Sequence, residues 1–491
     1  MSWIRRFDTR KLVTLIAFLA IFAMAARVSM DTDTWWHLRA GQWIVEHCSI
    51  LTADHFSYTR FGTAWQYPGW LVEVPMIWIF NWFGPGGMNL WTAAMVTLAF
   101  IFIWKTMQGG PFMRAFVIVL AAAASGVYWA ARPYLVTFVL SAVFLWLLED
   151  YRTQGYPSKY RRLYWLPALM VLWANSHGGF AVGFIILGVY LLGTVGICIT
   201  NRRPKIVFSQ PAFKSLAILL LLNFIAVCIN PYGPVMLLYP FKTIGIGALQ
   251  DYIQEWQSPN FHAIEVQPFV WLLLLTFSAL GISRRRIQWE DLALSVGFAY
   301  MGLLAGRNVA LFALAAPMVM TRHLAPITEA LSRRIGFRPL ATGTVPRAKG
   351  LLNVAIAVIL FFAVVLKVML VLPESVNESA FARGLPLKAV AYIQESQPVG
   401  RMLSSYNWGG YLLWALPEYP VFVDGRTDLY NDEIINEWLQ AVRAEPGWED
   451  VLDRWDVRLV LLEPGTPLLS ELKVEGWQML FQDEKAVLYG R

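Results

Sequence analysis

Charged residues and cysteines are both scarce in this chain of 491 residues. Only 15% of the residues are charged and three are cysteines, whereas 57% are hydrophobic. Three cysteines cannot build the disulfide framework of a small secreted domain. With so little charge, the chain is also too apolar for an ordinary soluble protein. The composition therefore indicates a membrane protein.

Nucleotide-binding signatures are missing as well. The sequence has no Walker A motif, and no glycine-rich turn follows a strand at the start of a soluble βαβ unit. We therefore expect no reaction that uses ATP or a nucleotide sugar. Nucleic acid is not an expected partner either, because the only sizeable soluble region, 373–491, carries 10 Lys+Arg and 19 Asp+Glu.

Apolar runs recur along the first three quarters of the chain. Each is about the length needed to cross a hydrocarbon core of roughly 30 Å. The sequence predicts a polytopic α-helical membrane domain over residues 1–372 and a separate domain over 373–491. The eleven predicted crossings are 12–29, 87–105, 114–131, 134–149, 163–175, 180–199, 213–230, 267–282, 289–305, 308–321 and 350–372.

The distribution of Lys and Arg predicts how these crossings are oriented. With the N-terminus in the cytoplasm, 23 of these residues fall in inner loops and 6 in outer loops, as the positive-inside rule requires. An odd number of crossings then places residues 373–491 outside. We expect a multi-pass protein of the inner (plasma) membrane with an extracytoplasmic C-terminal domain. The first segment could instead be a cleaved signal, without a change of orientation.

The C-terminal region has the alternating pattern of an α/β domain. Strands are predicted at 401–405, 421–424, 458–462, 477–481 and 486–489, with helical segments between them. Asp424 and Arg426 lie at the end of one predicted strand. They could face a ligand there, since open α/β sheets bind ligands at strand ends. They could equally form a structural ion pair.

The first outer loop, residues 30–86, opens with an acidic and aromatic segment, Asp31–His37. Ionisable groups at a bilayer boundary are costly unless they serve a function. In an extended chain, Asp31 and Asp33 would point to the same side, where they could act as a base or hold Mg²⁺ or Mn²⁺. The alternative is a solvated linker with an interfacial belt of tryptophans. The candidate substrate-binding side chains of this loop are Trp35, Trp36, His37 and Glu73.

Later outer turns add further polar side chains, while the predicted inner turns are plain basic loops. Arg132 and Arg307 could clamp a phosphate at the hydrocarbon edge, since guanidinium suits phosphate geometry. His177 is a third candidate for that role, and Asn175 and Glu255 are candidate substrate contacts. Each has an ordinary alternative: a snorkelling arginine, a structural histidine or a helix-capping glutamate. We expect any chemistry to face outward.

These features together resemble the GT-C class of integral-membrane glycosyltransferases, which includes protein O-mannosyltransferases, the lipid A aminoarabinose transferase and oligosaccharyltransferase catalytic subunits. In that class an acidic pair follows the first membrane helix, juxtamembrane helices follow it, and a C-terminal domain lies outside. Asp31 and Asp33 match the acidic pair, and residues 66–83 match the second juxtamembrane helix. The sequence is also similar to a group of bacterial membrane proteins that share the segments Asp31–His37, Trp173–Gly179 and Asp424–Arg426.

The resemblance implies transfer of a sugar from a polyprenyl-phosphate donor to an acceptor hydroxyl of a glycan, lipid or protein. Asp31 or Asp33 would be the base, and Arg132, His177 and Arg307 would neutralise the leaving phosphate. The Trp-Trp-Asp-Tyr-Gly signature of oligosaccharyltransferases is absent, so transfer to asparagine sequons is not expected. Two alternatives are a transporter or flippase for lipid-linked glycans and a noncatalytic envelope assembly protein.

Overall fold

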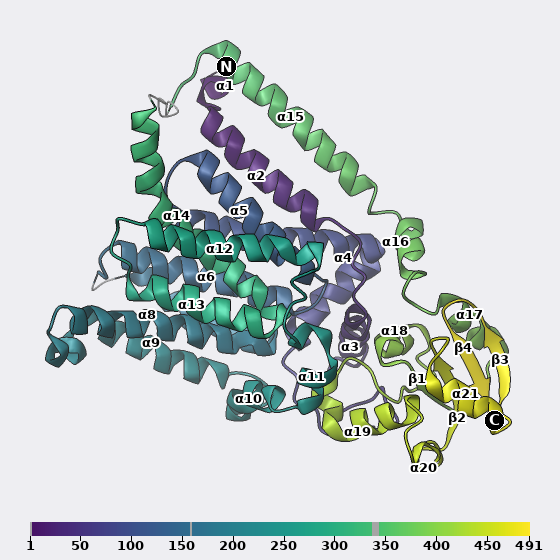
Figure 1. The fold of residues 1–491 in the computed structure, drawn as a ribbon. Helices are drawn as coiled ribbons and strands as arrows, with labels where there is room; N and C mark the ends of the chain where they lie inside the picture. Colours follow the sequence, from purple (N-terminus) through teal and green to yellow (C-terminus); the bar gives the residue numbers. More distant parts are fainter. Residues whose placement is uncertain (1, 158–159, 336–342) are drawn as a thin grey trace.

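The computed structural model describes residues 2–157, 160–335 and 343–491. It has two parts: a large assembly of helices and a small α/β domain at one end of it (Figure 1). The α-helices of the first part are α1 (Ser2–Arg6), α2 (Thr9–Ala25), α3 (Asp33–His47), α4 (Trp70–Thr106), α5 (Pro111–Ser125), α6 (Tyr134–Thr153), α7 (Trp165–Ala174), α8 (Ala181–Thr200), α9 (Pro211–Val227), α10 (Tyr239–Ile244), α11 (Gly247–Tyr252), α12 (Gln267–Ile282), α13 (Trp289–Leu304), α14 (Val309–Arg334) and α15 (Arg347–Met369).

Seven helical segments of the described residues are long and apolar enough to cross a membrane. The chain is a multi-pass membrane protein, and each of the eleven predicted crossings falls on a helix. The other four predicted crossings fall on helices of fewer than 18 residues, the shortest length among these seven segments. They are α2, α7, α9 and α13, with 17, 10, 17 and 16 residues. The number of crossings therefore stays a prediction. The seven segments are 70–106, 111–128, 134–153, 178–200, 264–282, 306–334 and 347–369.

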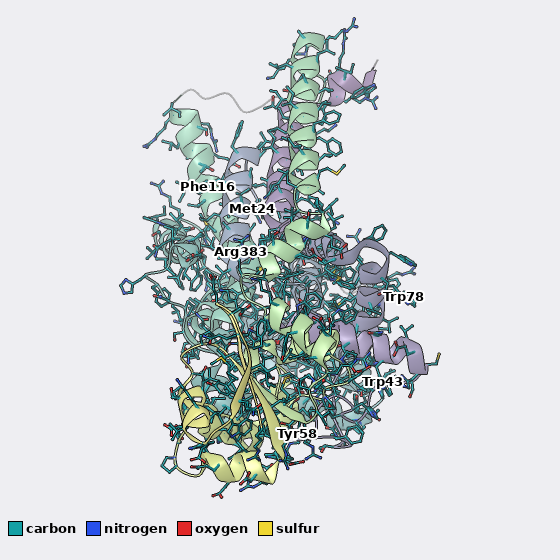
Figure 2. All side chains as sticks on the ribbon, turned by 90° about the vertical axis from the view of Figure 1, so that its right-hand side faces the viewer. Met24, Trp43, Tyr58, Trp78, Phe116 and Arg383 are labelled. Carbon is teal, nitrogen blue, oxygen red and sulfur yellow. The ribbon has the colours of Figure 1, made fainter. Side chains whose placement is uncertain are left out.

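Helix α14 lies at the centre of the helical part and α15 at its edge. In the most apolar stretch of α14, 83% of residues are buried, against 11% in α15. Alanines at 310, 313, 315 and 316 are buried in α14, and such small residues let neighbouring helices approach closely. On the outside of the assembly, Phe116 and Trp78 project away from the protein (Figure 2), with 61% and 49% of their surface exposed.

The predicted first outer loop, residues 30–86, is largely helical. Helix α3 already begins at Asp33, so the predicted extended Asp-x-Asp segment is wrong at its second residue. The predicted juxtamembrane helix begins at Trp70 and continues into the membrane span as α4. The two halves of α4 are separated at Gly84, whose φ of 59° favours glycine, and Pro85 is suited to start the second half.

The C-terminal domain has a four-stranded sheet with the order β1-β2-β4-β3. Strand β1 pairs parallel to β2, while β4 is antiparallel to both β2 and β3. The predicted strand 421–424 does not form; instead Val421 makes isolated bridges to Ser57 of the first loop and Met402 of β1. The elements of this domain are α16 (Glu374–Phe381), α17 (Leu387–Ser396), β1 (Arg401–Ser404), α18 (Tyr406–Ala415), α19 (Thr427–Val442), α20 (Trp448–Arg454), β2 (Val457–Leu462), α21 (Pro467–Val474), β3 (Gln478–Gln482) and β4 (Val487–Gly490).

The end of the bundle opposite the C-terminal domain contains a buried ion cluster that the sequence analysis missed. Arg322 contacts Glu149 and Asp291, and Arg152 Nη2 lies 2.9 Å from Glu149 Oε1. His323 Nε2 lies 3.2 Å from Asp291 Oδ2. All five residues are less than 9% exposed. The expectation that this end has only plain basic loops is therefore wrong, because α14 continues as a helix past Arg322.

We expect Arg322→Met to lower the free energy of unfolding by about 3–5 kcal/mol, because it leaves two buried carboxylates short of a partner. Chemical unfolding of the purified protein in detergent, followed by tryptophan fluorescence, measures the change. Arg162→Met is the control: Arg162 is 61% exposed and lies 3.1 Å from Asp150, so its loss should cost less than about 1 kcal/mol. Equal effects of the two substitutions would contradict a structural role for the buried cluster.

Candidate functional site

The guanidinium group of Arg132 lies among three carboxylates. Arg132 Nε donates to Asp31 Oδ1 at 2.6 Å, and Nη2 contacts the other oxygen of the same carboxylate. Nη1 lies 2.9 Å from Asp33 Oδ2 and 3.4 Å from Glu255 Oε2. The two predicted catalytic aspartates and a predicted phosphate ligand thus form one cluster, which we call the acidic-arginine cluster: Asp31, Asp33, Arg132, Glu255 and Arg307.

Four separate segments supply this cluster. Asp31 and Asp33 stand at the start of α3, where Asp31 Oδ1 also accepts from the backbone N–H of Asp33 at 2.9 Å. Arg132 lies two residues before α6, and Glu255 lies in a 3₁₀ turn, Gln254–Trp256. Arg307 lies in the 3₁₀ turn Gly306–Asn308 that precedes α14. The segments meet at the end of the bundle that carries the C-terminal domain.

Arg307 makes fewer ion-pair contacts than Arg132. Its Nη1 lies 3.5 Å from Glu255 Oε1, a long contact, and its side chain is 32% exposed. The guanidinium carbon lies 4.5 Å from the centre of the Trp256 ring, a distance at which a cation is attracted to an aromatic face. Arg132 is already bonded to carboxylates, so Arg307 is the cation of the cluster better placed to receive a further anion.

The cluster shifts the proton affinity of its carboxylates in opposite directions. Burial raises the pKa of Asp33 to about 7; Arg132 opposes the rise, and the negative charges of Asp31 and Glu255 add to it. Burial alone would also raise the pKa of Glu255, but the positive charges of Arg132 and Arg307 outweigh the effect of burial and lower that pKa. A carboxyl that titrates near neutral pH beside one that stays ionised is the arrangement that general acid–base chemistry uses.

His177 lies near the cluster as a neutral side chain. Burial lowers the pKa of His177 to about 3, and the positive charge of Arg307 adds to the effect. Its Nδ1 accepts from the backbone N–H of Gly179 at 3.0 Å and lies 2.8 Å from Thr137 Oγ1. Because Nδ1 is an acceptor, the ring proton is on Nε2. His177 can therefore donate a hydrogen bond to an anion, and its predicted role at the leaving phosphate stays a prediction.

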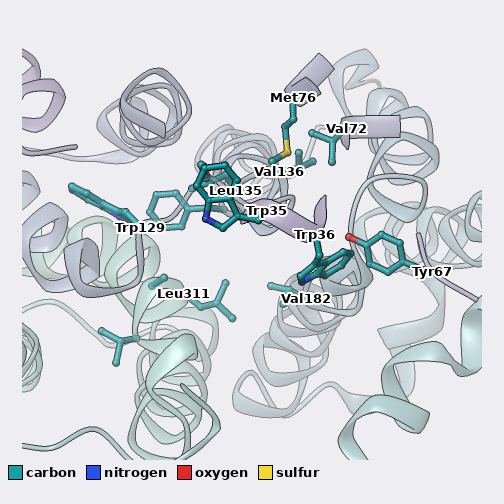
Figure 3. Packing of buried hydrophobic residues seen from close by; sticks show 14 of the residues in the cluster. Trp35, Trp36, Tyr67, Val72, Met76, Trp129, Leu135, Val136, Val182 and Leu311 are labelled. Carbon is teal, nitrogen blue, oxygen red and sulfur yellow. The ribbon is translucent and has the colours of Figure 1, made fainter. Parts of the chain in front are cut away.

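Five predicted substrate contacts are buried inside the protein. His37 Nδ1 lies 2.8 Å from Glu73 Oε1, which ties α3 to α4. Trp36 lies against His37, with ring centres 3.5 Å apart, and packs beside Tyr67 (Figure 3). The role of these side chains as substrate contacts stays a prediction. The exposed fractions are 7% for Trp35, 6% for Trp36, 5% for His37, 1% for Glu73 and 5% for Asn175.

Asn175 has a structural role that its burial explains. Its Nδ2 donates to the carbonyl oxygens of Val171 and Ile229, each at 2.8 Å, and its Oδ1 accepts from Trp70 Nε1 at 3.1 Å. These bonds join the end of α7 to the ends of α4 and α9. They satisfy polar groups that would otherwise be buried without partners.

The C-terminal domain reaches the cluster through the loop that contains Asp424 and Arg426. Asp424 and Arg426 form a fully buried ion pair, with Arg426 Nη2 2.7 Å from Asp424 Oδ2; of the two alternatives, the geometry favours the structural pair. Between them, the main chain of Gly425 lies directly against the Asp33 carboxylate. Tyr406 of α18 is also near, since the charge of Asp33 adds to the effect of burial in raising the pKa of Tyr406. Gly425 belongs to the segment Asp424–Arg426 that the sequence indicated, but its contact with Asp33 was not predicted, and neither was Tyr406.

The acidic-arginine cluster does not fit the Mg²⁺ or Mn²⁺ that the sequence allowed. The Arg132 guanidinium occupies the space between Asp31 and Asp33 and bonds to both. In the described part of the chain, no group of three or more His, Cys, Asp or Glu side chains is placed to hold a metal ion.

No family model and no curated protein sequence matches the chain. Solved structures do match. The archaeal oligosaccharyltransferase AglB from Archaeoglobus fulgidus, in complex with an inhibitory peptide and a dolichol-phosphate, aligns with a TM-score of 0.60 at 12% identity, over 92% of this chain and 69% of that one. An A. fulgidus oligosaccharyltransferase tethered to an acceptor peptide aligns with a TM-score of 0.56 at 12% identity, over 94% and 70%.

A third match is ArnT from Cupriavidus metallidurans in the apo state, with a TM-score of 0.47 at 14% identity, over 98% of this chain and 97% of that one. Its score is too low to carry an argument. The oligosaccharyltransferase alignments show that the chain shares the fold of these membrane proteins, as the sequence resemblance predicted. At such low identity, the likeness establishes the fold alone.

The raised pKa of Asp33 predicts a specific pH dependence of stability. The folded state holds the Asp33 proton more tightly than the unfolded state, whose pKa is near 3.8. The resulting stabilisation is complete below about pH 4 and is lost as pH rises through about 7. Asparagine does not titrate, so Asp33→Asn should become more stable relative to the unaltered protein between pH 4 and 8. The relative gain should reach up to about 4 kcal/mol, from three pKa units.

Unfolding midpoints in denaturant across this pH range measure the effect. Asp456→Asn serves as the control, because Asp456 lies on the surface beside Arg458, with 61% of its side chain exposed. If the difference between the unaltered protein and Asp33→Asn were constant from pH 4 to 8, the raised pKa of Asp33 would be refuted.

Proposed function

We propose that the protein transfers a sugar from a polyprenyl-phosphate-linked donor to an acceptor hydroxyl, at the membrane face that carries the C-terminal domain. The acidic-arginine cluster is the observation that carries this proposal. It combines a carboxyl that titrates near neutral pH with a cation open to an anionic group. The GT-C-class architecture supports it, and the oligosaccharyltransferase from A. fulgidus was solved with a dolichol-phosphate bound.

In the proposed reaction, Asp33 is the base and Asp31 is not. Asp31 accepts two bonds from Arg132 and one from the backbone, so its oxygens are occupied. Asp33 has a single contact to Arg132, through Oδ2, and its side chain is 20% exposed. Asp33 would take the proton of the acceptor hydroxyl as the acceptor oxygen bonds to the anomeric carbon. A base with a pKa near the working pH is the most effective in this role.

Arg307 would receive the departing lipid phosphate. The bond between the anomeric carbon and the phosphate oxygen breaks on the opposite side of the sugar, so the configuration inverts, and the phosphate keeps the electron pair. A guanidinium aimed at that oxygen stabilises the charge that develops. Neutral His177 could add one hydrogen bond. Arg132 fixes the two aspartates rather than the phosphate.

The proposed location is the inner membrane, with the N-terminus in the cytoplasm and the C-terminal domain outside. The positive-inside distribution supports this orientation. Nucleotide sugars are not available on that side, whereas lipid-linked phosphates reach it within the membrane plane. A lipid-linked donor is the class of substrate that fits such a site.

We expect Asp33→Asn to lower the transfer rate by about 10²–10⁴, the usual contribution of a general base, with little change in donor affinity. Arg307→Gln should instead weaken donor binding, because it removes the cation facing the phosphate. Liposomes containing the purified protein and a panel of polyprenyl-phosphate-linked sugars provide the assay. Product formation is followed by mass spectrometry, and donor binding by native mass spectrometry.

Arg443→Gln is the matched control for Arg307, because Arg443 is exposed on the C-terminal domain and pairs with Glu445. It should leave both rate and binding unchanged. Full transfer activity in Asp33→Asn would show that Asp33 is not the base. A lipid donor that moves between leaflets without forming a product would instead indicate a flippase.

A further inference from the structure

The main chain of the C-terminal domain at Gly425 contacts Asp33, the proposed base. A Cβ atom added to Gly425 would lie 1.9 Å from Asp33 Oδ1 and 2.7 Å from its carboxyl carbon, well inside van der Waals contact. Gly425 is not among the glycines with positive φ. The position therefore requires the absence of a side chain rather than a backbone conformation that only glycine adopts.

Helix α18 approaches the same aspartate segment in the same way. A Cβ atom on Gly410 would lie 2.7 Å from the carbonyl oxygen of Thr32, and one on Gly409 would lie 2.3 Å from the carbonyl oxygen of Val423. Main chain thus packs against main chain on two sides of α18. Asp33 lies where the first outer loop and the C-terminal domain meet, with little room to shift relative to either.

A buried ion network holds the Gly425 loop in place. Arg426 Nε donates to Asp424 Oδ1 at 2.9 Å, and Tyr430 Oη donates to Asp424 Oδ2 at 2.8 Å. The guanidinium carbon of Arg426 lies within 6 Å of three aromatic rings, those of Phe56, Trp65 and Tyr430. Separating a buried charge from its partners is strongly destabilising. The residues on either side of Gly425 are therefore held rigidly.

The network crosses from the C-terminal domain into the first outer loop. Arg426 Nη1 lies 2.5 Å from Asp54 Oδ1. The second oxygen of Asp54 accepts from the backbone N–H of Ser57 at 3.0 Å and from its hydroxyl at 2.6 Å. Backbone bonds add to this link, since Val421 N donates to Phe56 O at 3.1 Å and Tyr58 N to Val421 O at 3.1 Å.

We propose that Gly425, Arg426 and Asp54 are positioning residues for the reaction: together they hold the main chain of the C-terminal domain against the Asp33 carboxylate and so set the geometry of the base. None of the three is required to touch the substrate. The proposal rests on the assignment of Asp33 as the base. Its geometric part, the contact between Gly425 and Asp33, can be tested without any activity.

The activity test uses Gly425→Ala. The added methyl group must push the Asp33 carboxylate away, so kcat should fall at least tenfold while the KM for the lipid donor changes less than about threefold. The pH midpoint of kcat should also move, because the displaced carboxyl leaves the environment that sets its proton affinity. Gly384→Ala is the matched control in the same domain: its nearest neighbour would be Met30 Cε at 3.9 Å, and it should leave kcat, KM and the midpoint unchanged.

The stability test asks whether the two positions interact directly. Gly425→Ala should lower the unfolding midpoint of the otherwise unaltered protein, but not that of an Asp33→Ala protein, in which the clashing carboxylate is gone. Strictly additive effects of the two substitutions would overturn the proposed contact. This outcome is distinct from failure of the proposed function, which would show as full activity in Asp33→Asn.

Asp54→Asn provides a second route that leaves Gly425 intact. It weakens the link between Arg426 and the first loop, so the pH midpoint of kcat should shift in the same direction as in Gly425→Ala, measured per folded molecule. A purely structural network would reduce the amount of folded protein while kcat and its pH midpoint per folded molecule stayed unchanged. That result would contradict the positioning role.

Discussion

One ion cluster, Arg132 with the carboxylates of Asp31, Asp33 and Glu255, is the interaction on which the proposed site depends. Without the guanidinium, three carboxylates would lie close together in a partly buried place, where like charges repel strongly. With the guanidinium in place, Asp31 is held by two bonds from Arg132, whereas Asp33 has a single contact with it. The arginine therefore gives two neighbouring aspartates different environments, and so different roles.

The cluster also explains why distant parts of the chain must meet. The aspartates come from the first outer loop, the arginines from turns before α6 and α14, and the glutamate from the turn after α11. The C-terminal domain closes over them through main-chain contacts at Gly410 and Gly425. A buried pair of carboxylates, Asp54 and Asp424, holds Arg426 across the boundary between loop and domain. The membrane part and the C-terminal domain thus build one site.

Composition and hydrophobic periodicity were enough to predict the helical membrane part, because apolar length is a strong signal in a chain with few charges. The strands β1, β2, β3 and β4 were also predicted close to their bounds. Segment 421–424 was mistaken for a strand, since its buried apolar residues lie between the first loop and strand β1 and form only isolated bridges to each. Sequence patterns report burial, but not which partner covers a segment.

The site was predicted in part for a similar reason. Asp31, Asp33, Arg132, Glu255 and Arg307 stood out as charges at predicted helix ends, and the fold brings them together. His37, Glu73 and Asn175 are also polar residues near predicted helix ends, yet their polar atoms form hydrogen bonds inside the protein. The close approach of Gly425 to Asp33 could not be predicted, because the neighbour of a glycine is known only from the fold. The charged residues of the buried cluster at the opposite end lie close to loops in the sequence, so they were interpreted as parts of basic loops.

The most direct test of the account is a double-mutant cycle on Asp31 and Arg132, with Asp31→Asn, Arg132→Gln and both together, read out as the free energy of unfolding in detergent. If the guanidinium organises the carboxylates, the two changes should be coupled by about 1–3 kcal/mol. Effects that add within about 0.5 kcal/mol would mean that the two side chains do not interact, and would contradict the central role given to Arg132.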